Sequence, residues 1–203
     1  MIAEAQMLPN RWNILALLFL VRTAPVIQYQ AAASLSPLLM SDYSLGIAEI
    51  GLLIGLYHAP GTALAFPGGA IGARLGDKRA VLIGLGLMAA GELVMPLAPN
   101  WPVELGARIL TGTGGILLNF MMLKMVADWF TGKETPTAMG IIGNAAPAGI
   151  AIALVTIPSA GEIGGRTLAS AAVLGYLLLA FIFLALVYRA PAETAAAARR
   201  QSL

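Results

Sequence analysis

Six long apolar runs dominate the chain, and short polar segments separate them. Each run is long enough to cross a bilayer, which takes about 20 helical residues. Lipid offers no partner for an open sheet edge, so all six runs are predicted to be helices. The pattern predicts an all-α membrane protein, with a transmembrane bundle at 13–188, a terminal segment at 1–12 and a tail or linker start at 189–203. The runs are approximately 13–38, 47–71, 80–98, 102–126, 137–158 and 168–188.

Composition agrees with a membrane location and excludes several functions. Of the 203 residues 59% are hydrophobic and only 11% are charged, whereas soluble domains carry about 25% charged residues. The chain has no cysteine and one histidine, which excludes disulfides, thiol catalysis and a multi-histidine metal site. The net charge of +2 is too small to indicate nucleic-acid binding. No cofactor or metal is expected.

The basic residues predict the orientation. With the N-terminus inside the cell, nine of the twelve Lys and Arg residues lie on cytoplasmic segments, and Arg166 alone lies in an outer loop. Cytoplasmic loops carry such an excess, so both termini are predicted to be cytoplasmic, in the plasma membrane of a prokaryote. The nine are Arg11, Arg74, Lys78, Arg79, Lys124, Lys133, Arg189, Arg199 and Arg200.

A charged, glycine-rich segment joins the second and third runs at 68–79. Its glycines recur every fourth residue, so on a helix they would form one face that a neighbouring helix could approach closely. Its four charges fall within 74–79 and cannot lie in hydrocarbon, which predicts a cytoplasmic turn. The glycines are Gly68, Gly72 and Gly76, and the charged residues are Arg74, Asp77, Lys78 and Arg79.

This segment resembles the loop between helices 2 and 3 of major facilitator superfamily transporters, whose pattern is roughly Gly-x-Leu-Ala-Asp-Arg-x-Gly-Arg-Lys. The chain departs from the pattern at Ala73, where the family has Asp, and at Asp77, where it has a second basic residue. The family's loop closes the cytoplasmic gate by pairing with the other half of the transporter. The alternative is a plain positive-inside loop with packing glycines. The matching positions are Gly69, Ile71, Arg74, Gly76 and Lys78, and the resemblance implies a gating role for Gly69, Gly72, Arg74, Gly76, Asp77 and Lys78.

The fourth run carries a second resemblance to this superfamily. Its motif is an Arg, two residues, a polar residue and Gly-x-Gly, which Arg108, Thr111, Gly112 and Gly114 match. The resemblance implies a link between Arg108 and proton coupling. Glu92 and Arg108 also lie at similar depth on either side of a short outer loop. We expect the two to pair directly, because each lowers the cost of burying the other.

Polar residues inside the runs are candidates for substrate binding. Arg22 lies about nine residues into the first run, roughly 14 Å deep, and so near mid-bilayer. A charge at that depth normally faces a cavity or a partner, and a guanidinium suits planar anions. We expect Arg22 to bind an anion with Gln28 nearby; the alternative is a structural Arg held by Gln28 and Gln30. His58 and Asn144 are further candidates, with a structural hydrogen bond or helix packing as the alternative.

The resemblance implies a secondary transporter. It covers only the first half of the usual twelve-helix fold, and that half is expected to consist of two inverted three-helix repeats. A central Arg in the first helix near Gln28, with Gly143-Asn144 in the fifth, looks like permeases of the cyanate and nitrate type. A small anion coupled to protons, or exchanged, is therefore expected, with a C-terminal six-helix half or a second copy as partner. Two alternatives stay open: a non-transport membrane protein, such as an assembly factor or enzyme subunit, and an inactive truncated fragment. No nucleophile–base set indicates an enzyme.

Overall fold

The computed structural model describes residues 10–64, 75–130 and 132–189, and in these ranges it contains helices and no strand. This confirms the predicted all-α membrane fold. In chain order the elements are α1 (Arg11–Ser34), α2 (Ser36–Tyr43), α3 (Ile47–Leu64), α5 (Asp77–Val94), η1 (Met95–Leu97), α6 (Trp101–Trp129), η2 (Gly132–Glu134), α7 (Thr135–Gly143) and α8 (Ala145–Val187).

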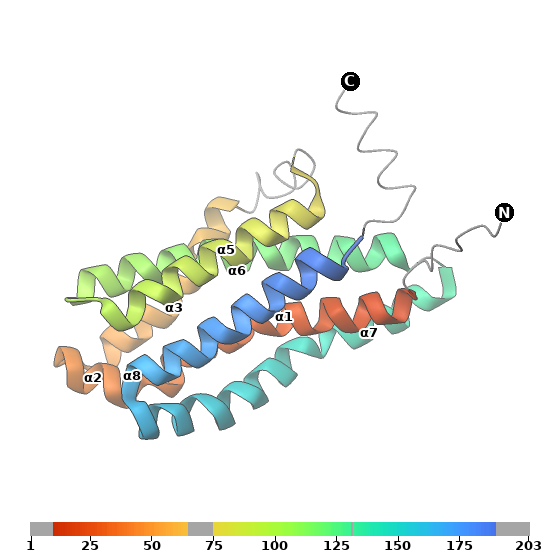
Figure 1. Ribbon diagram of the computed structural model, residues 1–203. Coiled ribbons are helices and arrows are strands. Elements are labelled where there is room, and N and C mark those ends of the chain that lie inside the picture. The colour runs from red at the N-terminus through yellow and green to blue at the C-terminus, as the bar shows by residue number, and fades with distance from the viewer. Residues whose placement is uncertain (1–9, 65–74, 131, 190–203) are drawn as a thin grey trace.

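The longest helix, α8, is two passes rather than one. Its 43 residues would extend about 65 Å if straight, twice the thickness of a hydrocarbon core. Gly164 and Gly165 break it: Gly165 has φ +62°, a conformation that glycine adopts readily and other residues avoid. Figure 1 shows α7 and the first arm of α8 running one way and the second arm returning along α1. The sequence predicted a loop across 159–167, whereas the helix continues to the glycine kink.

The first predicted run is also bent. It extends to 38 in the sequence, but α1 ends at Ser34 and α2 begins at Ser36, with Pro37 in its first turn. The axis then turns by 118° between α2 and α3. With α2 lying at the end of the bundle, the crossing segments are α1, α3, α5, α6, α7 with the first arm of α8, and the second arm of α8 (Figure 1).

The bundle has two distinct ends. We call the end that holds α2 and the Gly164–Gly165 break the kink end, and the end at which α1 begins and α6 and α8 finish the basic end. At the basic end Arg11 binds Glu134 at 2.9 Å, and Lys124 pairs with both Asp77 and Asp128. At the kink end the described part of the chain places two basic residues, the buried Arg108 and the more exposed Arg166. The charge asymmetry that the sequence predicted therefore separates the two ends in space.

Glycines bring α6 against the backbones of two neighbours. A Cβ at Gly112 would overlap the main-chain oxygen of Tyr57 on α3, and one at Gly114 would overlap the main-chain oxygen of Gly84 on α5. Van der Waals contact at this separation is possible only without side chains. The glycines of the second superfamily resemblance thus set the helix packing around Arg108, which lies one turn earlier on α6.

Gly112→Ala is expected to destabilise the protein by about 1–3 kcal/mol or more, because overpacking forces α3 and α6 apart. Gly106→Ala on the same helix is the matched control, since nothing lies within 4 Å of a Cβ there. That change should be neutral or slightly stabilising, as Ala favours a helix by about 1 kcal/mol over Gly. Thermal unfolding in detergent measures both variants, and equal melting temperatures would disprove the packing role of Gly112.

Candidate functional site

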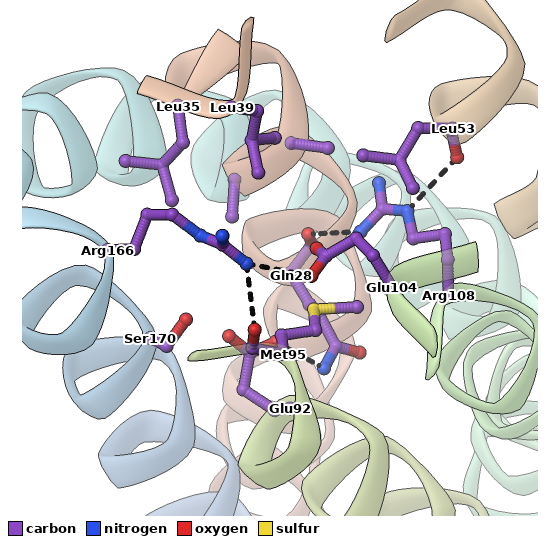
Figure 2. A pocket seen from close by; sticks show the side chains of 12 residues that line it. Gln28, Leu35, Leu39, Leu53, Glu92, Met95, Glu104, Arg108, Arg166 and Ser170 are labelled. Carbon is purple, nitrogen blue, oxygen red and sulfur yellow. Dashed lines mark hydrogen bonds and ion pairs between the residues drawn. The ribbon is translucent and has the colours of Figure 1, made fainter. Parts of the chain in front are cut away.

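Four charged side chains surround a small cavity near the kink end. Glu92 comes from α5, Glu104 and Arg108 from α6, and Arg166 from the second arm of α8 (Figure 2). Its free space holds about one water molecule. We call it the polar cavity. Its remaining lining residues are Gln28, Ala31, Ala32, Leu35, Leu39, Leu53, Met95 and Ser170.

Arg108 is almost completely buried, at 1% exposure, yet each of its nitrogens has a partner. Nε donates to the carbonyl of Leu53 at 3.3 Å, Nη1 to that of Gln28 at 3.2 Å and Nη2 to that of Tyr29 at 2.8 Å. The Tyr57 ring adds a cation–π contact at 4.8 Å. These main-chain carbonyls offset the desolvation of the guanidinium. Arg108 therefore ties α6 to both α1 and α3.

Glu92 forms its side-chain hydrogen bond with α1 rather than with α6. It is 3% exposed, and its Oε2 accepts a hydrogen bond from Gln28 Nε2 at 2.8 Å. The same nitrogen donates to the carbonyl of Met88 at 3.0 Å. The direct Glu92–Arg108 ion pair that the sequence predicted is not among the contacts of these two described residues. Both residues bond Gln28 of α1 instead: its side chain donates to Glu92, and its carbonyl accepts from Arg108.

Glu104 and Arg166 form a second charged pair at the same cavity, and sequence reasoning did not select either residue. Arg166 Nη2 binds Glu104 Oε2 at 2.8 Å and the carbonyl of Met95 at 2.8 Å. Its Nη1 reaches Asp42 at 3.4 Å, and its guanidinium lies over the Tyr43 ring. Two signals were present: Arg166 is the lone basic residue of the predicted outer loops, and Glu104 precedes Arg108 by one helical turn.

Arg22 lies apart from this network. It is half-buried and shares with Phe19, Val26 and Tyr29 a stripe of α1 that is only partly covered. Its Nη1 is buried and has no hydrogen-bond partner among the described residues. The expected neighbourhood of Arg22 and Gln28 does not occur, because six residues at 100° each place Gln28 on another face of α1. Gln28 is 0% exposed there and turns toward α5.

The other two substrate candidates lie on exposed surface. His58 is exposed on α3, and its ring lies 4.8 Å from that of Tyr29. Tyr29 follows Arg22 by two helical turns, so His58 lies beside the same stripe of α1. Asn144 is exposed at the junction of α7 and α8, and its side-chain amide donates to the carbonyl of Gly140 at 2.8 Å. That bond within one helical turn leaves its side-chain oxygen available.

The gating segment is only partly described, because Gly69, Gly72 and Arg74 lie outside the described residues. Gly76 has φ +77° immediately before α5, a conformation that favours glycine. Asp77 pairs with Lys124 of α6, so its described partner lies within this bundle.

Lys78 of the same segment holds the end of α8. Its Nζ donates to the carbonyls of Ala185 and Tyr188, both at 2.8 Å. A cation at a helix C-terminus satisfies free carbonyls and complements the helix dipole. The segment thus fixes the end of α8 relative to α5 and α6.

Comparison with known proteins identifies the class of protein. A family model described as Major Facilitator Superfamily matches residues 15–202. The inner membrane transport protein YajR of Escherichia coli (strain K12) is 33% identical over 112 residues, which are 55% of this chain and 24% of that protein. The hexuronate transporter of Bacillus subtilis (strain 168) is 24% identical over 143 residues, which are 70% of this chain and 34% of that protein.

The multidrug efflux pump LfrA of Mycolicibacterium smegmatis (strain ATCC 700084 / mc(2)155) is 30% identical over 124 residues, or 61% of this chain and 25% of that protein. In these three alignments the chain therefore spans between 24% and 34% of the length of the relative.

Proposed function

The chain belongs to the Major Facilitator Superfamily, and we propose on that basis that it moves a small anion across the membrane by alternating access. Proteins of this family are transporters, and the relatives described above carry transporter and efflux-pump names. This points to a multi-pass membrane transporter and away from an enzyme. The substrate is therefore a small solute, and we further propose that this solute is negatively charged.

Arg22 carries the proposal of an anionic substrate. Its guanidinium has a buried nitrogen without a partner, on the stripe of α1 that the described helices leave partly uncovered. Gln28, which could have held Arg22 as a structural residue, bonds Glu92 and Met88 instead. A planar anion would supply the missing acceptor in bidentate geometry.

The chemistry of the remaining groups fits the same class of ligand. Tyr29 belongs to this stripe and His58 lies beside Tyr29, and both can donate a hydrogen bond to an anion. Asn144 is the third candidate, at the junction of α7 and α8. The resemblance to cyanate and nitrate permeases supports a small inorganic or organic anion. One relative is named for hexuronate, which carries a carboxylate.

We propose that a C-terminal six-helix half, or a second copy of the chain, completes the transport cavity. Two observations support this: the chain spans at most about a third of the three relatives, and α3 leaves a complete stripe exposed. That stripe includes Gly51 and Gly55, where nothing lies within 4 Å of a Cβ. Transport sites in this architecture lie at mid-membrane between repeats.

Because a cell interior is negative, anion uptake needs a coupled cation or an exchanged anion. We propose proton coupling, with Glu92 and Arg108 as the coupling pair joined through Gln28. Exchange is the alternative. The substrate test is binding to the complete protein in detergent: nitrate, cyanate and a hexuronate should bind, whereas the hexose without the carboxylate should not. Binding of the neutral sugar alone would refute the anion proposal.

The proposed orientation puts the basic end and both termini in the cytoplasm of a bacterium. The chain has no cysteine, so single cysteines report their side directly. Cys at Lys133 should react with an impermeant thiol reagent only from inside, and Cys at Ile163, which is 81% exposed, only from outside. The reverse labelling pattern would overturn this topology, which follows from the excess of basic residues.

A further inference from the structure

We infer that the polar cavity is the proton-access site of the transporter: Glu92 binds the coupled proton, which reaches it from the kink end when Arg166 leaves Glu104. This inference rests on the proposed function, since it names the group and the route by which proton coupling would operate. It assigns a role to Glu104, Arg166 and Ser170, which the family resemblance does not cover.

The surroundings of Glu92 suit a group that gains and loses a proton. Every element packed against it presents polar groups, but no cation of the described residues bonds it directly, so Glu92 is not fixed as an ion-pair partner there. As an anion it is stabilised by the Gln28 donor and by the nearby charge of Arg108; as a neutral acid it avoids the cost of a buried charge. The groups facing it are Gln28 from α1, Tyr57 from α3, Glu104 and Arg108 from α6, and Arg166 and Ser170 from α8.

A water molecule in the polar cavity would connect Glu92 with the pair at its edge. The cavity has room for about one water and is lined by polar groups of four helices, α1, α5, α6 and α8. Gln28, which lines it, has a buried Oε1 without a hydrogen-bond partner in the described part of the chain, and such an acceptor is normally satisfied by water when protein groups do not reach it. Ser170, also on the lining, offers a hydroxyl that can both donate and accept (Figure 2).

Arg166 separates this cavity from the kink end. Its side chain is 14% exposed, whereas that of Glu104 is 4% exposed, so Arg166 is the more solvent-accessible member of the pair. It bonds Glu104 on α6, the carbonyl of Met95 on η1 and Asp42 on α2. Arg166 immediately follows Gly165, the left-handed residue of the kink. A change of conformation at the kink would therefore move Arg166 directly.

The proposed step is a simple proton transfer. With Arg166 withdrawn, a proton from water at the kink end passes through the cavity water to a Glu92 carboxylate oxygen, which becomes a neutral carboxylic acid. After the transporter reorients, Glu92 returns the proton to water on the other side and regains its negative charge. Arg166 stays cationic throughout and re-forms its bond with Glu104.

The test uses the complete protein in liposomes, with two measurements on each variant: net anion uptake driven by a pH gradient, and exchange of labelled for unlabelled anion, which needs no net proton movement. Glu92→Gln should reduce net uptake about tenfold or more, a typical coupling effect, and leave exchange intact. Arg166→Gln with Glu104→Gln, which removes the pair as a unit, should weaken the coupling of uptake to the pH gradient. Glu162→Gln, an exposed carboxylate at the kink end, is the control and should change neither.

The outcomes separate the two proposals. If the wild-type protein neither takes up nor exchanges any small anion, the proposed function fails. If wild-type uptake is proton-driven and Glu92→Gln keeps both the rate and its pH dependence, the proton-access site is wrong. Carbodiimide labelling tests the inference on the wild-type protein, so it does not depend on whether the variants fold. This reagent modifies protonated carboxyls. Glu92 should be labelled at acidic pH and progressively less as the pH rises, and labelling that is absent or independent of pH would overturn the inference.

Discussion

Replacing Arg22 by Lys is expected to weaken anion binding about 10–100-fold, although Lys keeps the positive charge. A hydrogen bond to a charged group contributes about 1.5–3 kcal/mol, and an ammonium cannot reproduce the planar fork of donors that binds two oxygens of one anion. Arg22→Gln, which also removes the charge, should bind still more weakly. Calorimetric titration of the complete protein in detergent, with the anion that binds wild type, measures the change.

Arg11→Lys is the matched control for this prediction. Arg11 lies on the same helix, but its side chain is 50% exposed and pairs with Glu134 at the basic end, so anion affinity should not change. A structural Arg22 held by its own helix would tolerate Lys as a point charge. Wild-type affinity in both Arg22→Lys and Arg22→Gln would show that Arg22 does not hold the substrate.

Arg108→Gln is expected to produce the largest loss of stability, about 3–5 kcal/mol, because removing one member of a buried charged network leaves the rest uncompensated. Three main-chain carbonyls on α1 and α3 lose their donor, and Glu92 loses its nearby positive charge. Unfolding of the protein in mixed detergent micelles measures the free energy. Arg79→Gln, an exposed residue at the basic end, should have almost no effect.

The double variant Arg108→Gln with Glu92→Gln distinguishes a direct pair from a relayed one. Since Gln28 lies between the two charges, the second substitution should restore part of the stability, with a coupling free energy of about 0.5–3 kcal/mol. Complete recovery would indicate a direct ion pair. Strictly additive losses would show that the two residues do not form one network, and the proposed coupling pair would be wrong.

The hydrophobic pattern predicted the all-α membrane fold well because it follows from the length and apolar character of the runs. Lipid requires about 20 apolar residues per crossing and admits no open sheet edge, so the runs had to be helices. The packing role of the α6 glycines could be predicted, since Gly112 and Gly114 match a known motif. Their partners, Tyr57 and Gly84, appear only when the helices are arranged in space.

The candidate site was less predictable, because it depends on helix rotation and on long-range contacts. Depth along a run correctly indicated that Glu92 and Arg108 line one cavity, but it could not show that each of them bonds Gln28 of α1. Proximity in sequence suggested that Gln28 accompanies Arg22, whereas helix rotation directs Gln28 to α5. The Arg166–Glu104 pair joins residues 62 positions apart, a contact that appears only when the helices are arranged in space.

Uptake of a labelled small anion into liposomes containing the complete protein shows whether the protein transports anions and whether Arg22 binds them. We expect saturable uptake that unlabelled anion inhibits and that a neutral analogue of the same size does not inhibit. Arg22→Gln should abolish this uptake, whereas Arg11→Lys should preserve it. Saturable uptake that the neutral analogue inhibits and that Arg22→Gln leaves unchanged would contradict the account, as would the absence of uptake for every small anion tried.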